Sequence, residues 1–441
     1  MDNAKYCCEC GNEIFFYCRK CGEYNRSGKY CIACGAKNDP RDWESASTNP
    51  NDYSWENVYK DVSGTYTADR LVFLKGNYYA KKIEIRRGTR IICDGALKSD
   101  DNKQTIVEEI IIPDSVSQIG MKAFWGCSGL QSIVIPDSVT QIGEEAFAGC
   151  NSLQSIVIPD SVTEIGVFAF SNCDSLPRRD DGLLIINDWL IEAPSNIEQI
   201  TIPNIVRKIG VCSFSGCGSL RSIVIPDSVI HIGYEAFSNC FGLQSIVIPD
   251  SVTQIGNGAF KNCRNLQTIV VSEDNTVYDS RNNCNAIIET KGNILVVGCS
   301  QTIIPDSIAQ IGYVAFCGCE SLQTIVIPDF VTQIGDGAFC GCESLQSVVI
   351  PDSVTQIGDW AFGGCLSLQS IVIPNSVAQI GHSAFCGCNS LQTIVIPDSV
   401  MQIGDEAFWE CGSLQSIFIP NGTKEKFQKM LPEYEHLLQE H

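Results

Sequence analysis

The sequence has 441 residues, of which 51 are acidic and 30 are basic, and its formal charge at pH 7 is −21. This surplus argues against nucleic acid or an anionic membrane as the main partner, because both are polyanions; a large soluble surface often carries such a charge too. No apolar run is long enough to span a bilayer, and residues 1–12 lack the basic and apolar regions of a secretory signal. We therefore expect a cytoplasmic protein whose 25 cysteines are reduced.

Six of the seven cysteines in residues 1–34 form three copies of the motif CxxCG. Two residues between the thiols let one tight turn point both sulfurs at a single ion, and two such turns supply the four thiolates of a structural zinc site. The candidate zinc ligands are Cys7, Cys10, Cys18, Cys21, Cys31 and Cys34. The spacing predicts a zinc domain over residues 1–40, and the segment resembles small zinc ribbons over about 30 residues.

The pairing of these motifs stays open. The motifs at 18–21 and 31–34 are separated by nine residues, which suits a hairpin and makes them the best candidate pair. The motif at 7–10 competes for the middle motif or helps to hold a second ion, and Cys8 is the odd thiol. A disulfide cluster and a thioredoxin-like CxxC are the alternatives, but neither a signal peptide nor a βαβ pattern accompanies the cysteines.

A site of four thiolates has no open coordination position, so the zinc is expected to be structural rather than catalytic. Residues 1–40 carry six Lys or Arg against five Asp or Glu, which lacks the basic footprint of a nucleic-acid module and favours a structural or protein-contact role. Residues 41–60 are rich in Ser, Asn, Asp and Pro and are predicted to be a linker.

A 23-residue repeat then dominates the sequence. Its most regular mark is a cysteine spaced by 23 residues within each of three groups: Cys127, Cys150 and Cys173; Cys217, Cys240 and Cys263; Cys319, Cys342, Cys365, Cys388 and Cys411. Self-similarity at this period is typical of a solenoid, in which each coil covers the apolar face of the next. We predict a solenoid over residues 61–421 with around fourteen coils.

One coil illustrates the expected structure. The segment LQSIVIP at 130–136 suits a strand with Ile133 inward and Val134 outward, and its proline ends the strand at a turn. VTQIG follows as a second extended piece, and EEAFAGC is expected to be a short helical turn that buries Phe147 and Cys150. The repeat cysteines are then reduced core residues, because bridging neighbouring coils would strain a disulfide. The first thiols of three doublets, Cys317, Cys340 and Cys386, are candidates for the surface.

Two insertions and a terminal segment interrupt the repeat. The insertions lie near 177–200 and 272–301, and each contains two apolar runs around a turn, which predicts a β-hairpin. Such insertions are either binding elements or tolerated additions. Residues 422–441 are expected to form a helical cap over the last strand.

The motif IPDSVTQIGEEAF, followed by GC.SLQSI.IP, closely resembles the BspA-like leucine-rich repeats of bacteria. The resemblance implies a leucine-rich repeat solenoid with a parallel β-sheet on its concave face, short helical turns opposite, and a role in protein recognition. Members of that family include surface proteins that bind matrix components and other cells, so a cell-surface adhesin exported by a non-standard route is the alternative to a cytoplasmic scaffold.

The repeated columns offer a contact surface but no catalytic constellation. An outward valine column continues into Phe418 beside columns of Gln and of Ser or Thr, and it indicates either an apolar contact surface or simply high β-propensity. Its valines are Val134, Val157, Val224, Val247, Val326, Val349, Val372 and Val395. The four histidines lack a nucleophile partner, and no phosphate-binding loop, HExxH or GxSxG is present. We predict a non-enzymatic scaffold for an unidentified protein partner, in an oligomeric state that the sequence does not specify.

Overall fold

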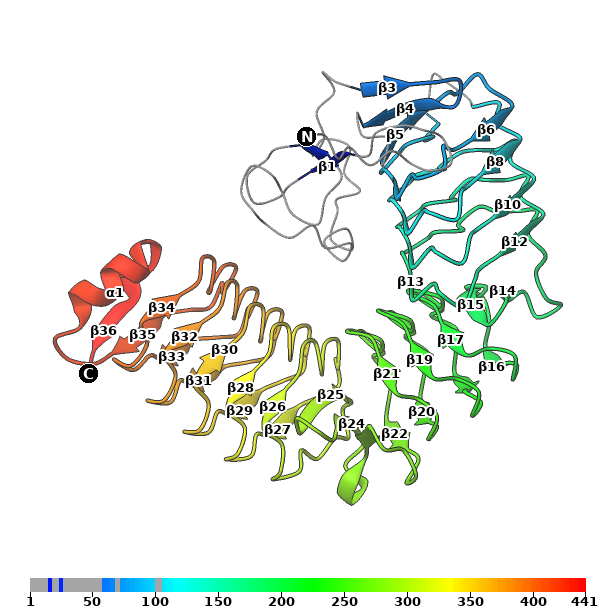
Figure 1. The fold of residues 1–441 in the computed structure, drawn as a ribbon. Helices are drawn as coiled ribbons and strands as arrows, with labels where there is room; N and C mark the ends of the chain where they lie inside the picture. The colour runs from blue at the N-terminus through cyan, green and yellow to red at the C-terminus, as the bar shows by residue number, and fades with distance from the viewer. Residues whose placement is uncertain (1–14, 18–23, 27–57, 68–71, 100–104) are drawn as a thin grey trace. The chain divides into compact units, whose positions relative to one another are not determined.

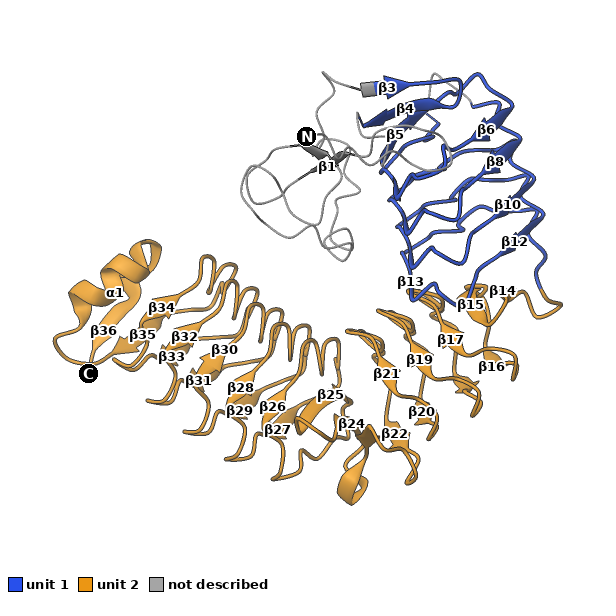
Figure 2. Cartoon of the chain, viewed as in Figure 1, with its two compact units in different colours: residues 1–178 blue, residues 179–441 orange. Residues whose placement is uncertain are grey.

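A computed structural model describes residues 15–17, 24–26, 58–67, 72–99 and 105–441. The chain divides into two compact units, residues 1–178 and residues 179–441 (Figure 2). Near the N-terminus, β1 (Phe15–Tyr17) and β2 (Tyr24–Arg26) pair as antiparallel strands. The six predicted zinc ligands all lie outside the described residues, so the zinc ribbon stays a prediction.

The first unit is a stack of coils with two parallel ladders (Figure 1). One ladder contains β6 (Lys82–Glu84), β8 (Glu109–Ile111), β10 (Ser132–Val134) and β12 (Ser155–Val157). The other contains β7 (Ile91–Ile92), β9 (Gln118–Ile119), β11 (Gln141–Ile142) and β13 (Glu164–Ile165). Equivalent residues of successive coils face each other, such as Ile133 and Ile156, so the repeat period sets the register.

Three antiparallel strands extend the second ladder at its N-terminal end, and the sequence did not predict them. They are β3 (Val58–Lys60), β4 (Gly64–Thr67) and β5 (Val72–Gly76). β5 then pairs in parallel with β7, so the three strands cover the edge of the first coil. Residues 58–60, which belong to the predicted linker, are therefore part of a sheet.

The second unit repeats the same two ladders. The strands at the first position are β16 (Gln199–Thr201), β18 (Ser222–Val224), β20 (Ser245–Ile248), β22 (Thr268–Val271), β27 (Thr324–Val326), β29 (Ser347–Val349), β31 (Ser370–Val372), β33 (Thr393–Val395) and β35 (Ser416–Ile419). Those at the second position are β17 (Lys208–Ile209), β19 (His231–Ile232), β21 (Gln254–Ile255), β26 (Gln310–Ile311), β28 (Gln333–Ile334), β30 (Gln356–Ile357), β32 (Gln379–Ile380) and β34 (Gln402–Ile403).

Both hairpins predicted in the insertions are confirmed. β14 (Leu184–Ile186) and β15 (Trp189–Glu192) pair antiparallel, and β15 continues in parallel to β17. β24 (Ala286–Glu289) and β25 (Ile294–Gly298) pair antiparallel beside β23 (Tyr278–Asp279) and the one-turn helix η3 (Arg281–Asn283), and β25 continues to β26. Each hairpin therefore joins the second ladder rather than standing apart from it.

The C-terminal segment is helical only in part. It contains α1 (Lys424–Met430), the 3-10 helix η4 (Pro432–Leu437) and a final strand, β36 (Leu438–Glu440). This strand, which the sequence did not predict, pairs in parallel with β35 and closes the edge of the first ladder.

The third side of each coil is not the expected helical turn. In the coil at 130–150, Glu145 and Gly149 have φ angles of 51° and 74°, which interrupt a right-handed helix. The N–H groups of Glu145, Phe147 and Gly149 instead donate to carbonyls of the next coil at 2.9, 2.8 and 2.8 Å. These hydrogen bonds form a third set of coil-to-coil contacts, which replaces the i→i−4 bonds of a helix.

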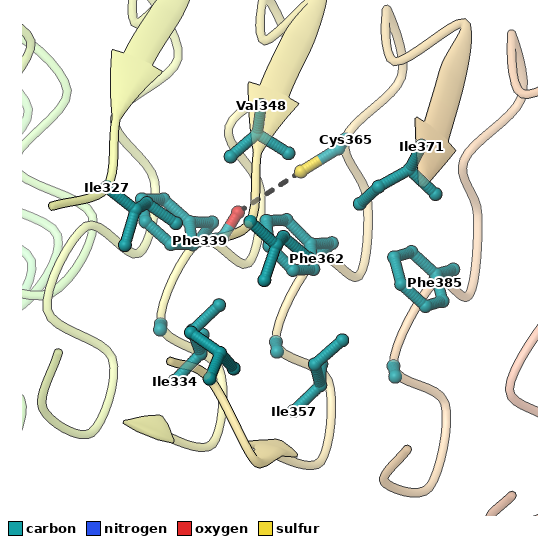
Figure 3. Close-up of a cluster of buried hydrophobic side chains, with 14 of the residues drawn as sticks. Ile327, Ile334, Phe339, Val348, Ile357, Phe362, Cys365, Ile371 and Phe385 are labelled. Carbon is teal, nitrogen blue, oxygen red and sulfur yellow. Dashed lines mark hydrogen bonds between the residues drawn. The ribbon is translucent and has the colours of Figure 1, made fainter. Parts of the chain in front are cut away.

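The core consists of aligned layers (Figure 3). In the second unit the buried rings of Phe316, Phe339, Phe362, Phe385 and Phe408 stack in order, with centroids 5.1 to 5.7 Å apart. Isoleucines of both ladders flank the rings, such as Ile371 of the first ladder and Ile334 and Ile357 of the second. No single coil can bury these side chains alone, so stability depends on stacking neighbours.

Candidate interaction surface

The outward residues of the first ladder form an exposed apolar stripe in each unit. In the first unit this valine stripe consists of Ile111, Val134 and Val157, which are 38, 74 and 58% exposed. In the second unit the stripe consists of Val224, Val247, Val270, Val326, Val349, Val372, Val395 and Phe418. Its most exposed members are Val326, Val349 and Val372, at 79, 74 and 62%. The predicted outward orientation of these valines is therefore confirmed.

The ladder register lines these side chains up along the stack. Val326 faces Val349 in the next coil, and Val372 faces Val395, which faces Phe418. Within each group of paired strands, β27–β29 and β31–β33–β35, neighbouring strands lie about 4.8 Å apart, so the apolar groups follow one another closely. Burial alternates along each strand, and the isoleucine beside each outward valine is part of the core.

The columns beside the stripe are polar and uncharged in the C-terminal coils. Over β27–β33, the two residues that precede each inward residue are Gln and then Ser or Thr: Gln323 and Thr324, Gln346 and Ser347, Gln369 and Ser370, Gln392 and Thr393. This contrasts with the start of the first unit, where the equivalent positions Lys82 and Glu109 form an exposed ion pair of 2.8 Å. A chain of net charge −21 thus presents a neutral, partly apolar strip.

The final strand sets the C-terminal limit of this face. Gln439 Nε2 donates to Ser416 Oγ at 2.9 Å, and the His441 ring packs edge-on against Phe418 with centroids 5.7 Å apart. The last coil therefore keeps its outward side chains in contact with the cap, and the stripe is open from β27 to β33.

The predicted reduced core ladder of cysteines is confirmed. The repeat cysteines are free thiols, and all are buried except Cys411, which is half-buried. Where the preceding coil is a regular repeat, the cysteine donates its thiol hydrogen to the carbonyl of the phenylalanine 26 residues earlier. Cys365 Sγ, for example, lies 3.3 Å from Phe339 O (Figure 3). Burial raises the pKa of Cys127 and of Cys263 to about 12, so these thiols stay protonated at neutral pH.

The first cysteines of the three doublets are less exposed than the sequence suggested. Cys317 and Cys386 are buried, each 7% exposed, and Cys340 is half-buried. The pattern AFCGC gave no sign of this burial, because it depends on which residue occupies the same position in the neighbouring coil.

A small polar hollow lies on the turn side of the first ladder in the second unit. Arg221 stands where other coils have Gln, and Gly218 and Gly242 leave space beside it, with Glu198 across the hollow. A side chain at position 242 would meet the carbonyl oxygen of Gly218 at 2.7 Å, so glycine is required by the close approach of the coils. The hollow is a shape feature and holds no nucleophile and base in catalytic contact.

The histidines do not form a catalytic group. Burial and the nearby Lys208 lower the pKa of His231, whose ring packs 6.3 Å from that of Trp189. The backbone N–H of His382 donates to Asp359, and its ring packs on Trp360.

Within the described ranges, no cluster of three or more His, Cys, Asp or Glu side chains could hold a metal ion. None of the helices in those ranges is long and apolar enough to cross a membrane.

Comparison with known proteins identifies the repeat. The BspA type leucine-rich repeat region matches residues 79–179, 186–291 and 309–431, in six copies. The chain is 32% identical to a leucine-rich cell surface protein from Faecalibacterium prausnitzii, with 85% of this chain and 97% of that chain covered and a TM-score of 0.51. A leucine-rich repeat protein from Bacteroides ovatus is 26% identical, covering 97 and 96% at a TM-score of 0.35. The pneumococcal vaccine antigen PcpA is 16% identical, covering 88 and 96% at a TM-score of 0.47. No curated protein matches.

Proposed function

The chain belongs to the family of BspA-type leucine-rich repeat proteins, and on that premise we propose that it is a non-catalytic protein that binds a protein partner through the valine stripe of its second unit. The observation that carries this proposal is the neutral strip over β27–β33, where valines up to 79% exposed lie in register between uncharged polar columns. An exposed apolar band with a polar rim is typical of protein contact surfaces.

The chemistry of the strip favours a protein over the other partner classes. Its Gln, Ser and Thr side chains offer both donors and acceptors, and its valines offer apolar area, whereas polyanions require clustered Lys and Arg. Repetition of the same groups in every coil suits an extended contact rather than a catalytic centre.

A charge placed in the stripe tests this proposal. The double substitution V349K and V372K in the full-length chain should weaken recovery of a crosslinked protein partner from the native cells by at least about tenfold, because two lysines would have to be desolvated in the interface. D352K, at an exposed turn of the same coils, adds charge outside the stripe and should leave recovery unchanged. Equal recovery by the stripe variant and wild type, with both folded by circular dichroism, contradicts the proposal.

The alternative function is that of a cell-surface adhesin that binds host or matrix proteins. It is favoured by the description of the 32% identical relative as a cell surface protein. Labelling of intact cells with a membrane-impermeant amine reagent distinguishes the two: a cytoplasmic scaffold is labelled only after lysis, whereas an adhesin is labelled on intact cells.

We further propose that residues 1–40 form a structural zinc ribbon that serves as an accessory contact module. Its support is the three CxxCG motifs. The double substitution C18S and C21S should remove bound zinc, measured by elemental analysis of the purified chain, while C386S, in the repeat core, should retain it. Full zinc content in the first variant would show that these cysteines are not ligands.

A further inference from the structure

Two cysteines of neighbouring coils lie side by side on the turn side of the second unit. Cys317 and Cys340 each follow a core phenylalanine and occupy the same position of successive coils, 23 residues apart. The backbone confirms that their coils are adjacent, since Gly318 N–H donates to the Cys340 carbonyl at 2.8 Å. Asn262 N–H donates to the Cys317 carbonyl at 2.9 Å, so Lys261 precedes the two thiols in the same column.

This pair differs from the core ladder in its partners and access. The ladder thiols Cys342 and Cys365 donate to phenylalanine carbonyls and are fully buried. Cys340 is half-buried, and Cys317 Sγ lies 3.6 Å from the side-chain oxygen of Asn262. Cys386 occupies the same column further on, but Gly363 stands between it and Cys340.

The charges around the pair favour a thiolate on Cys340. The neighbouring Cys317 thiol, together with the Lys261 ammonium, lowers the pKa of Cys340 below its ordinary value despite partial burial. The neighbouring Cys340 thiol and burial raise the pKa of Cys317. Lys261 also faces Glu235 at 3.5 Å and Tyr313, which keep it protonated. One thiol is therefore the nucleophile and the other stays protonated beside it.

We propose that Cys317 and Cys340 form a reversible oxidation site, which a hydroperoxide converts into a disulfide. The Cys340 thiolate attacks an oxygen of the hydroperoxide, the O–O bond breaks, and the released oxygen leaves as water or an alcohol after taking a proton. The Cys317 sulfur then attacks the resulting sulfenic sulfur, the S–O bond breaks, and hydroxide leaves as water with the Cys317 proton. The two thiols supply the two electrons that reduce the peroxide.

The coil spacing allows this bond only if the two turns adjust, which is the strain expected for any disulfide between neighbouring coils. Neighbouring parallel strands lie about 4.8 Å apart, inside the Cα separation of about 4.4–6.8 Å found for disulfides. The Cβ atoms must approach to about 3.8 Å. Gly318 and Gly341, which follow the two cysteines with φ angles of 74° and 70°, give both turns the freedom to make that adjustment.

Peptide mapping of the full-length reduced chain tests the site. The sequence has no Lys or Arg between Lys291 and Lys424, so cleavage must use a protease specific for acidic residues, and Glu320 lies between the two cysteines. After stoichiometric hydrogen peroxide and alkylation of free thiols, we expect a linked pair of peptides containing Cys317 and Cys340, which dithiothreitol separates. Peroxide consumption without this link overturns the proposal, as does an equal yield of a link between Cys388 and Cys411.

Matched variants separate the chemistry from a loss of folding. C317S and C340S should each abolish the link, while C386S, in the same column, should leave its yield unchanged. K261Q should slow the first step by roughly tenfold or less while the disulfide still forms, because it removes the cation but neither thiol. An unchanged rate in K261Q, or a normal link in C340S, contradicts the assigned roles; thermal melting of every variant identifies any loss that comes from unfolding.

Discussion

Each repeat cysteine stabilises a carbonyl that would otherwise have a free lone pair in the core. The carbonyl of Phe339 accepts the N–H of Cys342 at 3.1 Å and the thiol of Cys365 at 3.3 Å. A buried carbonyl has two lone pairs, and leaving one unsatisfied costs free energy. Cysteine supplies a weak donor on a small apolar side chain, which explains its recurrence without disulfides or metal.

The substitution C365A should lower the free energy of unfolding by about 1–3 kcal/mol, because it removes both the thiol donor and buried volume. Urea denaturation of the full-length chain measures the change. C212A is the control: Cys212 is half-buried outside the ladder, and its loss should change stability by about 0.5 kcal/mol or less. A similar effect of both variants would show that ladder cysteines contribute nothing specific.

Alkaline pH should destabilise the protein through the same thiols. Burial raises the pKa of Cys263 to about 12 from an ordinary value of 9.0, so the native chain keeps a proton that the unfolded chain releases. Below pH 9 the thiol is protonated in both the native and the unfolded chain, so it makes no pH-dependent contribution to the free energy of unfolding. As pH rises from 9 towards 12 only the unfolded chain loses this proton, and the free energy of unfolding falls. The urea midpoint should therefore be lower at pH 10 than at pH 8, and C263A should reduce the difference; an equal difference in C263A contradicts this origin.

At the scale of the element, the two ladders and both hairpins could be predicted because apolar alternation and turn residues mark them directly. The third side of the coil could not, since EEAF resembles a helix start and the left-handed φ of Glu145 is imposed by hydrogen bonds to the next coil. The antiparallel strands β3–β5 and the strand β36 lie where the repeat has lost its pattern, and they form because a ladder edge needs a partner.

The left-handed turn position carries strain where the residue has a Cβ atom. Val314 has a φ angle of 47°, while Gly258 and Gly337 hold the same position in the coils on either side with φ angles of 64° and 61°. A left-handed L-residue costs roughly 1–2 kcal/mol, partly offset by the greater unfolded-state freedom of glycine. V314G should therefore raise the free energy of unfolding by about 0.5–1 kcal/mol in urea titration. V314A retains its Cβ and should give no gain; a gain as large as that of V314G would exclude backbone strain as the cause.

At the scale of the whole molecule, contacts join each coil mainly to its neighbours, so a local defect should spread over a limited distance. The valine stripe and the cysteine column could be placed from the sequence for the same reason, because one coil repeats its pattern in every layer. The placement of Lys261 next to Cys317 could not, since it requires knowing that the coils on either side of an insertion are neighbours.

The substitution F362A tests this nearest-neighbour stability. Phe362 is fully buried between Phe339 and Phe385, with ring centroids 5.3 and 5.5 Å away, so its truncation should cost about 3–5 kcal/mol. Hydrogen exchange by mass spectrometry should show the largest loss of amide protection in the coils around positions 339–385 and a smaller loss with each further coil of the second unit. V349K, an exposed change in the same region, should leave protection unchanged. A uniform loss of amide protection across the second unit in F362A would contradict nearest-neighbour stability. It would show that the whole unit unfolds cooperatively, because stacking between coils would then transmit the destabilisation to every coil.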